Sequence, residues 1–228
     1  MIKAIFFDAA GILYTRASHT QEFALNLLQN NGFTKEISSE QNKRLLTLRS
    51  QANQGEISHE VYWDRFLMLR GVLDPRQRKD YTVKITTYSN DVLPTQGSKE
   101  TLSELKQRGF ILGIITDTMY PVDWKVRRLK KAGVAEFIDI IACSTELGVH
   151  KPDPAIYSYA IQQANLNKGE SAFVGHLGLE LQGAHEAGMI TIAINHELDA
   201  NADYFCKSLL DLLTIPIFRK SIENLSNK

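Results

Sequence analysis

The chain has 228 residues, and its 26 lysine and arginine residues balance its 26 aspartate and glutamate residues. A formal net charge of zero gives no general attraction for nucleic acid or an anionic membrane, so neither is expected as a partner. No segment has the ~20 apolar residues of a membrane-spanning helix, and the expected location is cytoplasmic. Cys143 and Cys206 are too few for a disulfide framework and are expected to be small buried side chains.

The first predicted element is a buried strand over residues 2–7, which is rich in isoleucine and phenylalanine and stops at Asp8. From about residue 19 to residue 88, apolar residues recur at helical spacing between glycines, which indicates a helical insertion. One of its helices is expected to open at Asp74-Pro75. Three aromatic residues are expected in its core: Tyr62, Trp63 and Phe66.

After Pro94, helical and strand patterns alternate. The predicted helices cover residues 98–108, 122–132, 154–164 and 179–187. The predicted strands cover residues 110–116, 137–143, 172–175 and 190–195. Helices of about ten residues between strands of about five indicate βαβ crossovers and a parallel sheet. The predicted fold is therefore α/β, a Rossmann-like doubly wound parallel sheet. Residues 1–16 and 92–228 would form the core domain, and residues 17–91 a helical cap domain inserted after the first strand.

Polar residues follow the predicted strands at the edge where such sheets bind their ligands. Asp8 follows the first strand, and Thr116-Asp117 ends the second. Lys151 lies in the proline-containing loop His150-Lys151-Pro152, and His176 follows the fourth strand with Glu180 four residues later. We expect Asp8, Thr116, Lys151 and His176 to converge in one cleft beneath the helical insertion.

The order and spacing of these residues resemble the haloacid dehalogenase superfamily, most of whose members are phosphatases. K-P-D-P-A-I-Y at residues 151–157 and F-V-G followed by G-A-H-E-A-G within residues 173–188 are similar to family motifs. The resemblance implies that Asp8 is a nucleophile that forms an aspartyl-phosphate, while Thr116 and Lys151 bind the transferring group. It also implies Mg²⁺ bound through Asp8 and Glu180. It places four residues around the substrate: Ala9, Ala10, Asp117 and His176.

The sequence departs from the family pattern at the positions of two aspartates. Ala10 stands where the family has its general acid and base, and such a group typically contributes about 10²–10⁴-fold to the rate. His176 stands where an aspartate binds magnesium, and imidazole is a ligand that magnesium rarely selects. We therefore expect weak or absent magnesium binding, and slow, altered or absent hydrolysis of small phosphate esters.

Two alternatives remain open from the sequence. The chain could be a non-catalytic protein that binds a phosphorylated ligand or a partner. It could also use Asp8 in haloacid dehalogenase-type or phosphonate hydrolase chemistry, because branches of both kinds lack the second aspartate. In each case the expected ligand is a small phosphorylated or acidic metabolite. The sequence leaves the substrate and the oligomeric state open.

Overall fold

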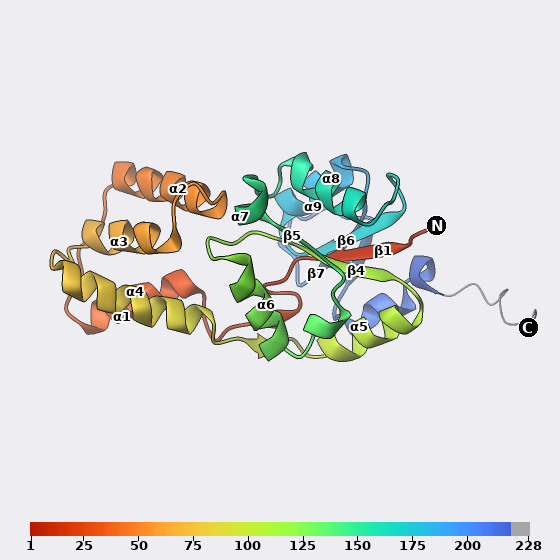
Figure 1. The fold of residues 1–228 in the computed structure, drawn as a ribbon, viewed down its shortest axis with the longest axis horizontal. Coiled ribbons are helices and arrows are strands. Elements are labelled where there is room, and N and C mark those ends of the chain that lie inside the picture. Colours follow the sequence, from red (N-terminus) through yellow and green to blue (C-terminus); the bar gives the residue numbers. More distant parts are fainter. Residues whose placement is uncertain (220–228) are drawn as a thin grey trace, which may run out of the picture.

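The computed structural model describes residues 1–219. Its centre is a six-stranded sheet in which every strand is parallel to its neighbours (Figure 1). The strand order is β5-β4-β1-β6-β7-β8. The bounds are β1 Ala4–Phe7, β4 Ile111–Thr116, β5 Ile140–Cys143, β6 Ser171–Gly175, β7 Ile190–Ile194 and β8 Tyr204–Cys206. The strand that precedes Asp8 is thus central, with a neighbour on each side.

Helices cover both faces of the sheet, which makes it doubly wound (Figure 1). On one face, α5 (Ser98–Gln107) and α6 (Val122–Lys131) pack on it together with two short 3₁₀ helices, Leu210–Thr214 and Pro216–Phe218. On the other face lie α8 (Pro154–Gln163) and α9 (Gly178–Glu186). Apolar residues fill both layers, which explains why the strands have apolar side chains on both faces.

Four of the five α-helices between β1 and β4 form a separate bundle to one side of the sheet (Figure 1). They are α1 (Thr20–Asn30), α2 (Ser39–Asn53), α3 (His59–Leu69) and α4 (Pro75–Ser89). The bundle has its own core, which includes Tyr62, Trp63 and Phe66 as expected. Asp74 caps α4 by accepting a hydrogen bond from the backbone N–H of Arg76 at 2.9 Å. We propose that residues 17–91, which contain this bundle, form the inserted cap domain.

The α/β prediction is confirmed, and three small elements were not predicted. The strands β2 (Tyr14–Thr15) and β3 (Leu93–Pro94) form a short antiparallel pair at the base of the cap, and α7 (Ser144–Leu147) follows β5. A strand of two residues is too short to show an alternation of apolar and polar residues, so the sequence does not predict β2 and β3. The sixth strand β8 was also missed. The strand predicted from residue 137 begins only at Ile140, because Ala135–Phe137 forms a 3₁₀ turn.

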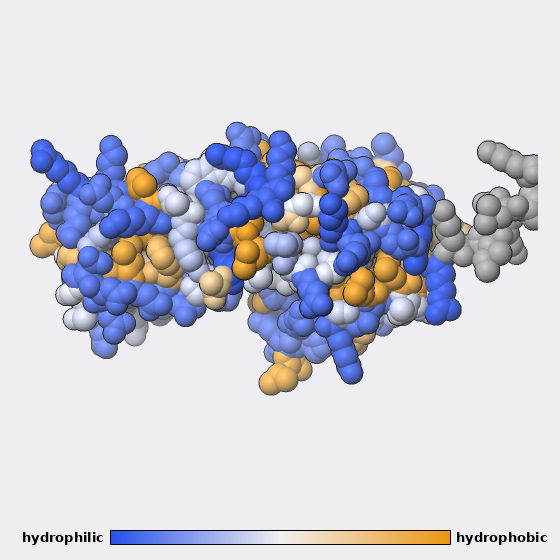
Figure 2. All heavy atoms as spheres, turned by 90° about the horizontal axis from the view of Figure 1, so that it is seen from below, coloured by the Kyte–Doolittle hydropathy of each residue, from blue (hydrophilic) through white to orange (hydrophobic). Residues whose placement is uncertain are grey.

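The surface has no broad apolar area on the face that Figure 2 displays, where hydrophobic residues gather in small patches among hydrophilic ones. Within residues 1–219, no helix is both long and apolar enough to cross a membrane. Cys143 and Cys206 are buried and unpaired, which confirms their expected role as small side chains in the interior.

Candidate active site

Asp8 is the first residue after the central strand β1. Its backbone N–H donates to the carbonyl oxygen of Val174 at 2.9 Å, which continues the pairing of β1 with β6 and fixes the position of the side chain. The residue is only 7% exposed. A carboxylate held at the carboxyl ends of parallel strands lies where such sheets bind their ligands.

Lys151 joins two carboxylates at this edge of the sheet. Its Nζ atom donates to Oδ1 of Asp8 at 2.8 Å and to Oε2 of Glu180 at 2.7 Å. Its backbone N–H donates to Oδ1 of Asp117 at 3.1 Å, which ties the Lys151 loop to the end of β4. The expected convergence of Asp8 and Lys151 is confirmed. Glu180 is also brought to this centre, on the first turn of α9.

One ammonium group therefore lies among three carboxyl groups. Burial disfavours the charged lysine, but Asp8, Glu180 and Asp117 together raise the pKa of Lys151 well above its ordinary range. Burial raises the pKa of Glu180 to about 7. Lys151 lowers this pKa, but the negative charge of Asp8 raises it and so opposes the effect of Lys151. Burial also raises the pKa of Asp117. Lys151 is thus permanently charged, whereas Glu180 exchanges a proton near neutral pH.

The backbone carbonyl of Glu180 is held by Tyr157, whose hydroxyl donates to it at 2.8 Å. Burial raises the pKa of Tyr157 well above its ordinary value, so the hydroxyl keeps its proton and remains a donor. Tyr157 thereby fixes the first turn of α9 against α8. This contact positions Glu180 without touching its carboxylate.

His176 lies beside the other oxygen of Asp8. Its Nδ1 atom is 3.7 Å from Oδ2 of Asp8 and, although buried, has no hydrogen-bond partner among the described residues. The ring packs over the turn at Gly11, where an added Cβ atom would come within 3.1 Å of it. Burial lowers the pKa of His176, although Asp8 acts in the opposite direction. At neutral pH the imidazole is therefore uncharged.

The remaining predicted residues lie around this centre. Thr116 is buried at the end of β4, two residues beyond Ile114, which pairs with Phe7. Ala9 is fully buried, and its carbonyl oxygen accepts hydrogen bonds from the backbone of Leu13 and Tyr14, so it shapes the turn after β1. Ala10 is half-buried and reaches a cavity. Its methyl group offers no acid or base there.

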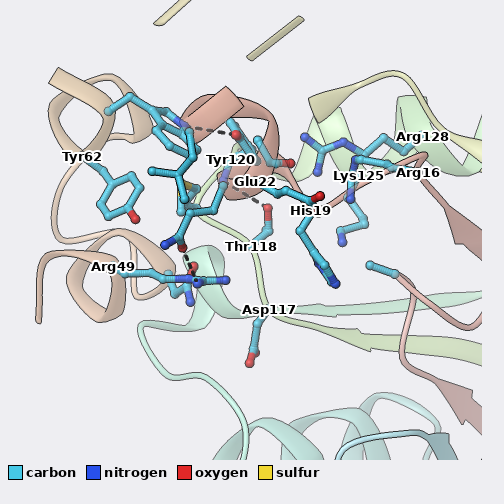
Figure 3. Close-up of a pocket in the computed structure, with 17 residues that line it drawn as sticks. Arg16, His19, Glu22, Arg49, Tyr62, Asp117, Thr118, Tyr120, Lys125 and Arg128 are labelled. Atoms are coloured by element: carbon cyan, nitrogen blue, oxygen red, sulfur yellow. Dashed lines mark hydrogen bonds between the residues drawn. The ribbon is translucent and has the colours of Figure 1, made fainter. Parts of the chain in front are cut away.

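That cavity has a volume of about 550 Å³ and is lined by residues of the cap and of the core (Figure 3). Ala10 and Asp117 line it on the core side, close in sequence to Asp8 and Thr116. Tyr62 and Trp63 line it from α3 of the cap. A cavity of this volume is in the range that holds a small metabolite.

The sequence analysis missed the cations of this cavity: Arg16, Arg49, Lys125 and Arg128. They lie outside the motifs that carry the family resemblance. Lys125 and Arg128 belong to α6, a helix with several other basic residues, so the sequence does not distinguish them from exposed lysines and arginines. The one available signal was their spacing, since residues three apart lie on the same face of a helix.

The donor groups around Asp8 do not suit magnesium. Lys151 lies between the carboxylates of Asp8 and Glu180, the two residues expected as metal ligands. Next to Asp8 the chain supplies an imidazole, whereas magnesium prefers oxygen ligands. Within residues 1–219, no group of three or more histidine, cysteine, aspartate or glutamate residues is arranged to hold a metal ion. Weak magnesium binding stays a prediction.

A pH dependence follows from Glu180, whose pKa rises from an ordinary value of 4.5 to about 7 on folding. The folded protein then binds a proton more tightly than the unfolded chain does, so raising the pH from about 4.5 to about 7 lowers the free energy of unfolding. We expect this fall in the free energy of unfolding to be on the order of 3 kcal/mol in the wild-type protein and to be absent from Glu180→Gln.

The measurement is denaturant unfolding of both proteins between pH 4.5 and pH 8. The stability of the wild-type protein relative to the variant should fall as the pH rises. A difference that is constant or that grows with pH would show that folding does not raise the pKa of Glu180. Glu186→Gln, a change on the exposed part of the same helix, serves as the control.

The comparisons with known proteins show the family of the chain. A model of the haloacid dehalogenase-like hydrolase family matches residues 5–194, so the chain belongs to this family. It is 27% identical over 208 residues to a glyceraldehyde 3-phosphate phosphatase of Methanopyrus kandleri, covering 85% of this chain and 84% of that one. It is 32% identical over 101 residues to (S)-2-haloacid dehalogenase 4A of Burkholderia cepacia, covering 43% and 42%.

Among solved structures, the fold is similar to that of a 2-haloacid dehalogenase from Pseudomonas syringae. The TM-score is 0.68 at 21% identity, and the match covers 94% of this chain and 97% of that one. This likeness supports the fold. The reaction has to be inferred from the residues around Asp8.

Proposed function

We propose that the protein is an aspartate-nucleophile hydrolase, related to phosphatases of small phosphate esters, that works slowly and without dependence on magnesium. The observation that carries the proposal is the buried contact of Lys151 with Asp8 at 2.8 Å. A lysine in this position offsets the charge of Asp8 as an anionic substrate approaches. The names of the phosphatase relatives support a phosphate ester as the substrate.

In the first step, an oxygen of Asp8 attacks phosphorus, and the bond between phosphorus and the leaving oxygen breaks. The leaving oxygen keeps the electron pair. Ala10 cannot protonate it, so the step is expected to be fast only for leaving groups that are stable as anions. Aryl phosphates meet this condition, whereas alkyl phosphates do not. The ammonium group of Lys151 stays beside Asp8 throughout.

In the second step, water attacks phosphorus, and the bond from phosphorus to Asp8 breaks. The proton of this water needs a base. The imidazole of His176 is placed to accept it through the exposed part of its ring, since the side chain is 26% exposed and its Nδ1 atom lies 3.7 Å from Oδ2 of Asp8. Because burial lowers its pKa, the imidazole is in the basic form at neutral pH. We propose His176 as this base, in the role that the residue at position 10 no longer fills.

The test is intact-mass spectrometry of the protein after rapid mixing with 4-nitrophenyl phosphate. We expect a burst of nitrophenolate and a chain that gains one phosphoryl group. His176→Asn should slow the loss of this group by about 10²-fold, because it removes the base without removing the nucleophile. Asp8→Asn should give no adduct. His185→Asn, which changes an exposed histidine on α9, is the matched control.

Equal adduct lifetimes in the wild-type protein and in His176→Asn would contradict the role of the imidazole. The absence of both adduct and turnover would contradict the hydrolase and favour the non-catalytic binding protein. That alternative keeps Asp8 and Lys151 only to hold a phosphorylated ligand. Ligand affinity would then depend on Lys151 while no covalent species forms.

A second candidate is attack by Asp8 on carbon with release of halide. One observation favours it: halide leaves without a proton, so Ala10 would cost nothing in that reaction. The partial match to a haloacid dehalogenase is in agreement with it. Incubation with (S)-2-chloropropionate distinguishes the two, because only this activity releases chloride.

A further inference from the structure

We propose that Lys125, Arg128 and Arg16 bind an oxyanionic group of the substrate, a carboxylate or a phosphate, at the end remote from the bond that is broken. The substrate would then be a small metabolite with two anionic ends. This inference rests on the proposed function in one respect, namely that the other end of the ligand lies at Asp8. The binding of an anion in the cavity is independent of any reaction.

Two of these cations are buried and have no carboxylate partner within residues 1–219. Lys125 is 2% exposed and Arg128 is 3% exposed. The Nζ atom of Lys125 donates to the hydroxyl of Tyr14 at 2.9 Å. Arg128 donates to Oδ1 of Asn90 at 3.1 Å and to Oγ of Ser89 at 3.0 Å. None of these acceptors is a carboxylate. Among the described residues, no carboxylate lies within 4.0 Å of either cation.

Lys151 provides the contrast within the same protein. It is 4% exposed, and its ammonium contacts two carboxylates. Buried charges in proteins are ordinarily paired in this way, because removing an ion from water is costly. Lys125 and Arg128 have the same burial without the same compensation. An anion supplied by a ligand would provide it.

The cations face one cavity. Arg16, Lys125 and Arg128 are among its lining residues, together with Asp117 after β4 (Figure 3). Ala10, in the turn after β1, also lines it. Arg16 lies on the same side, since its Nε atom donates to the backbone carbonyl of Ser89 at 2.8 Å. The two acidic residues that line the cavity are Glu22, which is exposed, and Asp117, which already accepts from Lys151.

The neighbouring tyrosine indicates a positive potential at this place. Burial by itself would raise the pKa of Tyr14, yet Lys125, Arg128 and Arg16 hold it below its ordinary value. The cations therefore outweigh the cost of burying a phenolate. A carboxylate or phosphate, which is ionised at neutral pH, would gain the same stabilisation without losing a proton from a weak acid.

The chemistry of the three groups suits an oxyanion. A guanidinium presents parallel N–H donors that match a carboxylate or a phosphate, and an ammonium adds a point charge. The cavity of about 550 Å³ holds only a small molecule, and its wall on the cap side includes Tyr62 and Trp63. A short ligand with one anion at Asp8 and one at the cations fits these constraints.

The test compares 3-phosphoglycerate with glycerol 3-phosphate by calorimetry. The two probes share a phosphate ester and differ in a carboxylate at the far end. Titration into Asp8→Asn prevents turnover and relieves repulsion by the nucleophile. We expect 3-phosphoglycerate to bind about tenfold more tightly, because its carboxylate meets charged donors. Adding Lys125→Met should remove this preference. Lys130→Met, an exposed lysine on the same helix, is the matched control and should retain it.

Lys125→Met leaves the buried hydroxyl of Tyr14 without its partner, so a second variant guards against misfolding. Tyr14→Phe with Lys125→Met removes both members of the contact, a change that is often neutral for stability. It should unfold at no lower temperature than the wild-type protein and show no preference between the probes. Its unfolding well below the wild-type temperature would mean that Lys125 is a structural residue and would overturn the proposal.

Equal affinity of the two probes, no binding of either, or loss of the preference in Lys130→Met would also overturn it. The proposed hydrolase function is tested separately, by adduct formation on Asp8. A protein that forms no adduct on Asp8 but still prefers 3-phosphoglycerate retains the anion site. A protein that forms the adduct without any preference loses the anion site alone.

Discussion

Replacing Ala10 and His176 together by aspartate is expected to raise hydrolysis of a plain alkyl phosphate by at least about 10²-fold, and to make it depend on magnesium. Aspartate at position 10 would protonate the leaving oxygen and later activate water. Aspartate at position 176 would place a second carboxylate beside Asp8, where the chain now has an imidazole 3.7 Å away. Two oxygen ligands on one side of the site suit magnesium.

The measurement is release of inorganic phosphate from glycerol 3-phosphate, with and without magnesium. Each single change should raise the rate much less than the pair does. Ala10→Asp alone leaves the imidazole at position 176 in place of a metal ligand, and His176→Asp alone leaves the site without a general acid. His185→Asp, on the exposed part of α9, controls for an added negative charge. Efficient hydrolysis of this ester by the unmodified protein would contradict the proposal that the missing acid at position 10 limits the reaction.

Replacing Lys151 by methionine is expected to abolish activity and to lower the free energy of unfolding by about 3–5 kcal/mol. The ammonium is the shared partner of Asp8 and Glu180, both largely buried, and its removal leaves two carboxylates facing each other without a cation. Covalent adduct formation on Asp8 should stop, because no cation would offset the charge of the nucleophile as the anionic substrate approaches. Lys99→Met, an exposed lysine on α5, should change neither property.

A second variant separates stability from catalysis. Lys151→Met with Glu180→Gln removes the cation and one of its two carboxylates, so much of the lost stability should return. Activity should stay absent, since Asp8 would still lack its cation. Denaturant unfolding and adduct formation measure the two effects. Recovery of activity in this pair would assign Lys151 a purely structural role.

The sequence predicted the centre of the molecule well, because strong local patterns specify it. Apolar runs such as residues 4–7 indicate a strand that is buried on both faces, and their alternation with helices indicates a parallel sheet. The short elements could not be predicted in this way. Tyr14–Thr15 pairs with Leu93–Pro94 across the whole cap, and two residues on each side leave no periodic signal.

For the candidate site, the sequence alone determined which residue types stand at the strand ends. Asp8, Lys151 and Glu180 were identified from their order, and Ala10 and His176 from their departure from a pattern. The tertiary structure decided their partners. It placed Lys151 between two carboxylates, and it placed Nδ1 of His176 beside Asp8 with no hydrogen-bond partner among residues 1–219. It also decided that Lys125 and Arg128 are buried cations in a cavity. The physical reason is that charge pairing and burial depend on distances between residues that are far apart in the chain, such as Tyr14 and Lys125, and no local pattern encodes those distances.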